Sequence, residues 1–228
     1  MHARMMLSLS LSVGSASGAA ELMPLTRTQL CVTEGAIAQA GAEPWWSVTD
    51  SKMRAYVNAM TAPLVQARFR YLGPTGNEAR LGSGELRRQI GLKLRAQDAC
   101  NLVYAMWRIE PESRLVVSVK SNRGQHTSAQ CANRGYRNIR PSRSAPVPAL
   151  GADTEHTLRA EMNGAQLRVF ADETLVWDGS LGAEALAFDG PVGIRSDNAR
   201  LQLQLRAGAP LDTSAAPAAC RAAGEESE

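Results

Sequence analysis

The clearest pattern of apolar and polar positions lies between residues 156 and 206. Apolar and polar side chains alternate there with a period of two, which predicts half-buried β-strands. The alternating apolar residues of the first and last runs are Leu158, Ala160 and Met162, then Leu201, Leu203 and Leu205. Asn163-Gly164 follows the first run and predicts a two-residue hairpin turn, because both residues tolerate positive φ. Asp172-Glu173 predicts a second tight turn, so we expect a series of antiparallel strands.

The first half of the chain also has the pattern of strands. The predicted segments are residues 54–58, 65–72, 86–95, 101–109 and 115–120. Residues 101–109 are apolar on both faces, which predicts a central strand that is covered on both sides. Residues 121–153 form the longest irregular stretch, and their polar, basic first half contains Cys131. A chain of 228 residues is long enough for one core, so the expected fold class is all-β, an antiparallel two-sheet β-sandwich.

The order of the last elements resembles a known family. A strand, the Asn163-Gly164 turn, a second strand, a short hairpin, the sequence GPVGIR at residues 190–195 and a final strand follow one another. This order resembles the end of the concanavalin A-like lectin and glucanase sandwiches, which include laminin-G-type modules. The resemblance implies a jelly-roll fold. It also implies a glycan ligand, held on a concave sheet or at the loops of its rim.

Four segments are expected along the chain. Residues 1–20 have the order of a signal peptide, with Arg4 before an apolar stretch and small residues after it. A disordered leader and an edge strand of alternating leucines are the alternatives. Residues 21–44 form an N-terminal segment, and residues 45–208 form the β-sandwich domain. Residues 209–228 have the composition of a disordered tail, which Cys220 would tether to the domain.

The four cysteines predict two disulfides. They are Cys31, Cys100, Cys131 and Cys220, and none forms the closely spaced pair that is typical of a zinc site. Of the three possible pairings, the topology favours Cys100–Cys131, which encloses one hairpin and the loop after it. Cys31–Cys220 would then join the two ends of the chain. Disulfides form in oxidising compartments, so we expect a secreted or periplasmic protein.

Composition excludes some classes of function. The 25 basic and 22 acidic residues give a net charge of +3, too small a bias to indicate a nucleic-acid partner. No apolar run approaches the roughly 18 residues of a membrane-spanning helix. Aromatic residues make up only 5% of the chain, which is low for a sugar-binding surface. No cofactor is indicated, and Asp197-Asn198, the nearest candidate for a calcium loop, is interpreted as the turn into the last strand.

A basic polar face is the candidate ligand site. Guanidinium and amide groups suit sugar hydroxyls and carboxylates, so acidic polysaccharide is one candidate ligand. An ordinary solvated basic face is the alternative. Alternation predicts that Arg68, Arg70, Gln89, Lys93, Arg95 and Arg108 project together with Tyr104. The Cys100–Cys131 bridge would add three residues of the long loop at one end of this face. The predicted ligand-binding residues are Arg68, Gln89, Lys93, Tyr104, Arg108, His126, Arg134 and Tyr136.

Evidence for catalysis is weaker. A retaining glucanase needs two carboxyl groups about 5 Å apart, and no pattern such as ExDxxE is present. Residues 84–91 resemble the alginate-lyase family at Glu85-Leu86-Arg87 and at Gln89-Ile90. Ser83 stands where that family has its first arginine, and Gly91 stands where it has a histidine, so a lyase assignment is in doubt.

The sequence is therefore consistent with three functions. The first is a secreted, non-catalytic module that binds a glycan or recognises a surface. The second is an enzyme that acts on polysaccharide, a lyase or a glycoside hydrolase. The third is a structural or adhesion domain that binds protein, and an exposed apolar patch at Trp45-Trp46 would favour it. The alternative for these two tryptophans is packing at the end of the core. His156 is expected at a strand end, and the oligomeric state is left open.

Overall fold

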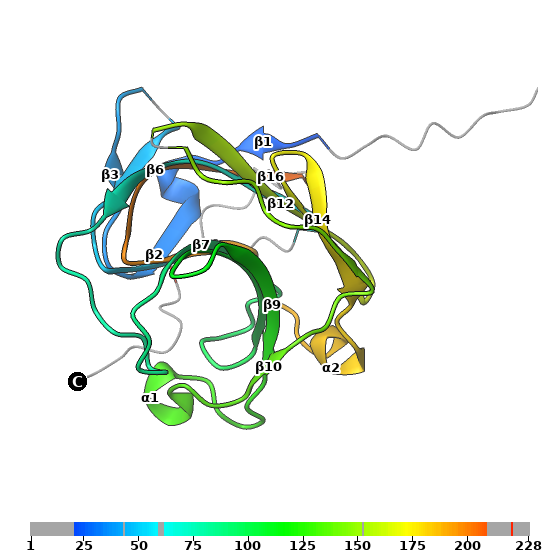
Figure 1. The fold of residues 1–228 in the computed structure, drawn as a ribbon. Coiled ribbons are helices and arrows are strands. Elements are labelled where there is room, and N and C mark those ends of the chain that lie inside the picture. The colour runs from blue at the N-terminus through cyan, green and yellow to red at the C-terminus, as the bar shows by residue number, and fades with distance from the viewer. Residues whose placement is uncertain (1–20, 43, 59–61, 152, 209–219, 221–228) are drawn as a thin grey trace, which may run out of the picture.

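The computed structural model describes residues 21–42, 44–58, 62–151, 153–208 and 220, and it folds as two antiparallel sheets packed face to face (Figure 1). The nine-stranded sheet has the order β11 (Arg143–Ser144), β14 (Thr174–Ser180), β13 (Gln166–Ala171), β12 (Glu155–Asn163), β6 (Leu64–Pro74), β16 (Ala199–Gly208), β4 (Trp46–Val48) and β3 (Ala38–Gln39). β1 (Met23–Pro24) also pairs with β16.

The seven-stranded sheet has the order β10 (Tyr136–Asn138), β9 (Arg114–Lys120), β8 (Leu102–Glu110), β7 (Arg88–Leu94), β15 (Gly193–Asp197), β5 (Lys52–Val57) and β2 (Leu30–Glu34). The helical elements of the described residues are short: η1 (Arg27–Gln29), α1 (Ser128–Cys131) and α2 (Ala183–Leu186). None of the described helices has the length and apolar character needed to cross a membrane. The predicted all-β sandwich is confirmed.

The core lies between the two sheets and uses the alternating residues of the predicted strands. Ile90, Leu92 and Leu94 of β7 are buried in it, and Phe69 of β6 meets Trp107 of β8 edge to face across the sheets, with ring centroids 5.6 Å apart. β8 lies between β7 and β9, and its residues 102–107 are all buried, as the doubly apolar pattern predicts.

The two predicted hairpin turns are present, and the first is displaced by one residue. Asn163 is the last residue of β12 and pairs with Gln166, so Gly164 and Ala165 are the central residues of the turn. Only Gly164 of these two has positive φ, at 58°, so this turn needs one residue with positive φ and a glycine supplies it. In the second turn both Asp172 and Glu173 have positive φ, as the short connection of β13 to β14 requires.

Several segments are more ordered than the sequence pattern indicates. The N-terminal segment 21–44 contributes strands to both sheets, since β1 and β3 belong to the nine-stranded sheet and β2 pairs with β5. Residues 121–153 are not simply irregular, because β10 forms an edge of one sheet and β11 an edge of the other. The predicted signal peptide and most of the predicted tail lie outside the described residues.

Both predicted disulfides are confirmed. Cys100 and Cys131 are bridged with their Cα atoms 5.8 Å apart, and Cys31 and Cys220 with theirs 5.5 Å apart. The first bridge fastens α1 and its loop beside β8, and the second fixes Cys220 beside β2. The two bridges indicate an extracytoplasmic, oxidising environment.

The side chains of Trp46 and His156 are buried and do not form part of an exposed surface. Trp46 is 1% exposed, whereas Trp45 is half-buried and lies beside the guanidinium groups of Arg68 and Arg70. His156 is at a strand end as expected, but its side chain is buried, and its Nδ1 lies 2.7 Å from Asp172 Oδ2.

Candidate functional site: a groove on the outer face of the seven-stranded sheet

The floor of the candidate site is the outer face of the seven-stranded sheet. Ile90 and Leu92 of β7 point into the core, so Gln89, Gly91 and Lys93 point outward. The register places Tyr104 beside Lys93 and brings a residue of β15 beside each outward residue of β7. The pairs are Asp197 with Gln89, Arg195 with Gly91, and Gly193 with Lys93.

One wall of the site is the loop of residues 75–87, which connects β6 in one sheet to β7 in the other. Asn198, which is fully buried, holds this loop. Its Oδ1 accepts a hydrogen bond from the Ala79 N–H at 2.8 Å, and its Nδ2 donates to the carbonyls of Ala79 and Arg87. Asn198 follows β15 directly and has a φ of 55°, so it forms the turn into β16, whereas Asp197 is the last residue of β15 and not part of that turn.

The opposite wall is the loop of residues 121–135, which contains α1. The Cys100–Cys131 bridge fixes it, and Lys120 Nζ donates to the carbonyls of Ala99 and Ala132, both at 3.0 Å. Asn101 Nδ2 donates to the Gln125 carbonyl. The two walls touch where Gly82 of the first loop meets Asn133 of the second. A Cβ atom added to Gly82 would lie only 3.1 Å from the Cβ atom of Asn133.

Two cavities lie between these walls, of about 190 Å³ and about 740 Å³. Six residues line both cavities: Leu81, Gly82, Tyr104, Asn133, Tyr136 and Arg195. We therefore treat them as two parts of one site, which we call the groove. A volume of 740 Å³ lies within the usual range of about 300–1,000 Å³ for small-ligand pockets.

A buried ion network forms part of the floor. Asp197 is fully buried, and its Oδ1 accepts from Arg54 at 2.7 Å. Its Oδ2 accepts from Arg195 Nε at 2.9 Å and from Gln89 Nε2 at 2.6 Å. Burial opposes ionisation of this carboxyl, but Arg195 and Arg54 outweigh that effect, and the pKa of Asp197 is lowered to about 2. The network fixes both guanidinium groups in position.

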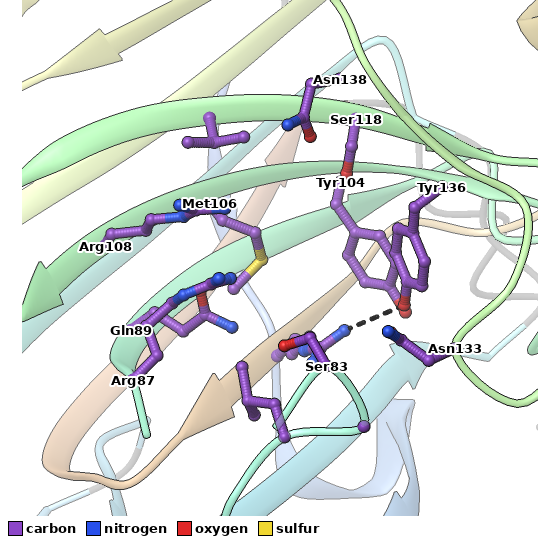
Figure 2. Close-up of a pocket in the computed structure, with 14 residues that line it drawn as sticks. Ser83, Arg87, Gln89, Tyr104, Met106, Arg108, Ser118, Asn133, Tyr136 and Asn138 are labelled. Carbon is purple, nitrogen blue, oxygen red and sulfur yellow. Dashed lines mark hydrogen bonds between the residues drawn. The ribbon is translucent and has the colours of Figure 1, made fainter. Parts of the chain in front are cut away.

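Two tyrosines form the centre of the groove. The rings of Tyr104 and Tyr136 are stacked, with centroids 6.0 Å apart and planes 22° apart (Figure 2). The Arg195 guanidinium lies 5.1 Å from the centre of the Tyr104 ring and donates a hydrogen bond to the Tyr136 hydroxyl at 3.4 Å. Burial, followed by the neighbouring Tyr136, raises the pKa of Tyr104 to about 12, so this hydroxyl stays protonated at neutral pH.

The larger cavity contains an unusual lysine. Lys93 is 7% exposed, and its Nζ lies 6.0 Å from the centre of the Tyr56 ring. Within the described part of the chain it makes no hydrogen bond or ion pair. Burial, and then repulsion by Arg54 and Arg195, lowers the pKa of Lys93 to about 7. About half of the molecules therefore carry a neutral amine at this position at pH 7.

The smaller cavity is basic as well. Arg87 and Arg108 line it, and burial, followed by the charge of Arg87, lowers the pKa of Arg108 to about 10. Among the residues that the structure describes, Arg108 Nε and Gln89 Oε1 are buried without a hydrogen-bond partner. Figure 2 shows Arg108, Gln89 and Arg87 on one side of this cavity and the tyrosine pair on the other. The polar side chains that line this side of the cavity suit a polar ligand.

The groove contains five of the eight predicted ligand-binding residues. Gln89, Lys93, Tyr104, Arg108 and Tyr136 all line it. Three others do not, and the predicted single face is corrected. Arg68 lies on β6 in the other sheet, where it pairs with Glu155 at 2.5 Å.

His126 and Arg134 lie on the wall loop but line neither cavity. His126 is exposed and pairs with Asp98 at 2.7 Å, and the guanidinium of Arg134 donates to the carbonyls of Gln130 and Cys131. Arg95 and Arg70 are also absent from the groove. Arg95 has a φ of 47°, lies just beyond β7 and donates to the Phe188 carbonyl.

Sequence reasoning missed several residues of the groove, most importantly Arg54, Lys120 and Arg195. The signal for Arg195 was present, because Gly193, Arg195 and Asp197 alternate with the apolar or small Ile194 and Ser196. The signal for Lys120 was the alternation of the apolar Val117 and Val119 with Ser118 and Lys120. Nothing in the sequence pattern shows that Arg54 and Arg195 share one buried carboxylate, because β5 and β15 are far apart in the chain.

The described lining of the groove contains few carboxylates. In the part of the chain that the structure describes, Glu34 is the one carboxylate that lines it, so the pair needed by a glycosidase is not found. The described residues also contain no cluster of three His, Cys, Asp or Glu side chains suited to a metal ion.

Comparison with known proteins places the fold. Neither a sequence family nor a curated protein matches the chain. Among solved structures, the carbohydrate-binding module CBM66 from Bacillus subtilis matches with a TM-score of 0.52 and 15% identity, over 77% of this chain and 92% of that one. The carbohydrate recognition domain of Emp47p matches with a TM-score of 0.52 and 9% identity, over 85% and 100%. The fold is that of the concanavalin A-like lectins and glucanases.

The two matched structures are a carbohydrate-binding module and a carbohydrate recognition domain. At such low identity the likeness concerns the fold alone. A domain of an arabinanase from Geobacillus stearothermophilus matches with a TM-score of 0.45 and 10% identity, over 78% of this chain and 82% of that one. This match is too distant to support the assignment of the fold. The resemblance seen at residues 190–195 is confirmed at the level of fold.

Proposed function

We propose that the protein is a secreted or periplasmic glycan-binding module whose ligand lies in the groove. The observation that carries the proposal is a stacked Tyr104–Tyr136 pair beside the side chains of Gln89 and Arg108, whose Oε1 and Nε atoms have no hydrogen-bond partner among the described residues. Sugar rings present apolar faces that pack on aromatic rings, and their hydroxyls need hydrogen-bond partners when they leave water. The groove supplies both. The two structures matched above are a carbohydrate-binding module and a carbohydrate recognition domain, which supports this choice of ligand class.

The proposed role is non-catalytic. The described lining residues include one carboxylate, Glu34, and the Asp197 carboxylate is fully used by Arg54, Arg195 and Gln89. A group that already accepts three charge-assisted or amide hydrogen bonds and has a pKa of about 2 is a poor proton donor or acceptor at neutral pH.

The test is a panel of neutral and acidic oligosaccharides, titrated by calorimetry against the intact protein and two variants. Tyr136→Ala removes half of the tyrosine stack, and because Tyr136 is 38% exposed on the edge strand β10, the fold should tolerate it. Phe170→Ala is the matched control, since Phe170 is a half-buried aromatic residue between two arginines on the nine-stranded sheet.

We expect Tyr136→Ala to weaken the best ligand by about tenfold, which is typical of losing one aromatic contact of about 1–2 kcal/mol, and Phe170→Ala to leave it unchanged. No binding across the panel, or equal losses in the two variants, would refute a glycan site in the groove.

A polysaccharide lyase is the second candidate, and one observation favours it. Arg87 and Gln89, which belong to the short segment similar to alginate lyases, both line the smaller cavity. Incubation with uronate polymers tests this role, because a lyase would produce an unsaturated sugar with ultraviolet absorbance. A steady absorbance over hours with a ligand that binds would leave the non-catalytic role standing.

A further inference from the structure

The charges that line the groove are strongly one-sided. The basic residues are Lys52, Arg54, Arg87, Lys93, Arg108, Lys120 and Arg195. Glu34 is the one acidic lining residue among those that the structure describes, and it lies 3.6 Å from Arg54. The whole chain has a net charge of only +3, so the excess of positive charge is concentrated here. Clefts that are lined by one sign of charge attract ligands of the opposite sign.

The buried Asp197 does not remove this excess. It offers one negative charge to two guanidinium groups, those of Arg54 and Arg195, so the network keeps a net positive charge. Both of its oxygens are already occupied by these groups and by Gln89. No capacity is left for Lys93.

The two lysines of the larger cavity differ in how they are satisfied. Lys120 Nζ is bound by the carbonyls of Ala99 and Ala132 and lies over the Tyr136 ring at 5.2 Å. Lys93 Nζ has no hydrogen bond or ion pair within the described residues, although it is 7% exposed. A buried cation without a counter-charge is costly, and no carboxylate of the described residues forms an ion pair with Lys93.

We infer that the larger cavity takes the anionic substituent of an acidic sugar, a carboxylate or a sulfate, as the missing counter-charge of Lys93. This inference rests on the proposed glycan site and names its ligand class. The guanidinium groups of Arg54 and Arg195 line the same cavity and are held in position by Asp197. The anion-binding position, which we call the anionic seat, is therefore formed before the ligand binds.

Binding of the anion should be linked to a proton. The charged and titratable groups that share the larger cavity with Lys93 are Glu34 on β2, Lys52, Arg54 and Tyr56 on β5, Arg195 on β15, Tyr104 on β8, Lys120 on β9 and Tyr136 on β10. Burial and its basic neighbours lower the pKa of Lys93 to about 7, so this amine titrates near neutrality. An anion binds the protonated amine, so affinity should fall by up to about tenfold from pH 6 to pH 8.

The experiment compares pairs of ligands in which the same sugar carries or lacks an anionic group. Oligogalacturonate and its fully methyl-esterified form are titrated at pH 6 and pH 8, and sulfated and desulfated galactan oligomers test sulfate in the same way. Polyglutamate serves as an anion that is not a sugar. We expect the free acid or the sulfated form to bind about tenfold or more tightly than its neutral partner, as one charged hydrogen bond provides.

Variants at one position separate charge from shape. Lys93→Met keeps the length of the side chain and should remove both the preference for the charged ligand and its pH dependence. Lys93→Arg restores the charge, and because arginine stays protonated, the preference should return without the pH dependence. Arg143→Met, on the edge strand β11 of the other sheet, is the control that should change neither.

The outcomes distinguish this inference from the proposed function. Equal affinity for charged and neutral partners, or a Lys93→Met protein that keeps the preference, overturns the anionic seat while glycan binding stands. Polyglutamate that binds as tightly as oligogalacturonate overturns the acidic-sugar ligand. Binding of none of these ligands, together with none of the neutral panel, refutes the glycan site itself.

Discussion

Replacement of Lys93 by methionine should stabilise the protein in a way that depends on pH. Burial beside Arg54 and Arg195 lowers the pKa of Lys93 from 10.5 to about 7, which means that the native fold disfavours the charged amine. Each pH unit of such a difference corresponds to about 1.4 kcal/mol, so the ammonium group costs the native state about 5 kcal/mol at pH 6.

The sign follows from proton binding. Between pH 7 and pH 10.5 the unfolded chain holds a proton on Lys93 that the native protein has released, so native stability rises with pH through this group. The cost is present in full below pH 7 and disappears near pH 10.5. Methionine has no proton to release. The advantage of Lys93→Met over the natural protein should therefore shrink by about 1.4 kcal/mol per pH unit across this range.

Urea denaturation of both proteins at pH 6, 7, 8, 9 and 10, with the disulfides intact, measures the advantage directly. The difference in unfolding free energy cancels the titration of all groups that the two proteins share. We expect an advantage of about 3–5 kcal/mol at pH 6 and less than about 1 kcal/mol at pH 10. A difference that is constant with pH, or that favours lysine at pH 6, would refute the reasoning about this buried amine.

Two further perturbations test the framework of the groove. Asp197→Asn should lower the unfolding free energy by about 3–5 kcal/mol at pH 7, because it leaves Arg54 and Arg195 buried without their counter-charge. Urea denaturation measures this loss, and a loss below about 1 kcal/mol would contradict the assigned network. Its natural contribution should vanish as the pH falls from about 4 through 2, where the carboxylate is protonated. Replacing both Cys100 and Cys131 by alanine should lower the unfolding free energy by about 4 kcal/mol, by the loop-closure relation for a separation of 31 residues. It should also weaken glycan binding, because one wall of the groove is no longer fixed. Unchanged stability and affinity would show that the bridge does not hold that wall.

The fold could be predicted because its signals are local. Alternation in β7 separates Ile90 and Leu92 from Gln89 and Lys93, and a strand needs only its own residues to show two faces. The turn at Asp172-Glu173 likewise depends on two adjacent residues with positive φ. The pairing of Cys100 with Cys131 follows from one hairpin, since Leu102 pairs with Lys120.

The candidate site could be predicted only in part, because it is made by pairing between distant strands. Alternation shows that Arg68 faces away from the core, but it does not show which sheet carries it, and β6 belongs to the sheet opposite the groove. Asp197 looked like a turn residue because its partners, Arg54 and Gln89, lie 143 and 108 residues away in the chain. The wall loops depend on the same kind of distant contact, as the bonds of Asn198 to Ala79 show.

The most direct test of a glycan site in the groove is the map of backbone amide resonances that shift when the best oligosaccharide of the panel is added. The groove predicts that the shifts cluster on the outer-facing residues of β7, β8, β10 and β15 and on the loops of residues 75–87 and 121–135. Shifts that cluster instead around Trp45 and Arg68 on the nine-stranded sheet would contradict the account, because they would place the ligand on the opposite face of the sandwich.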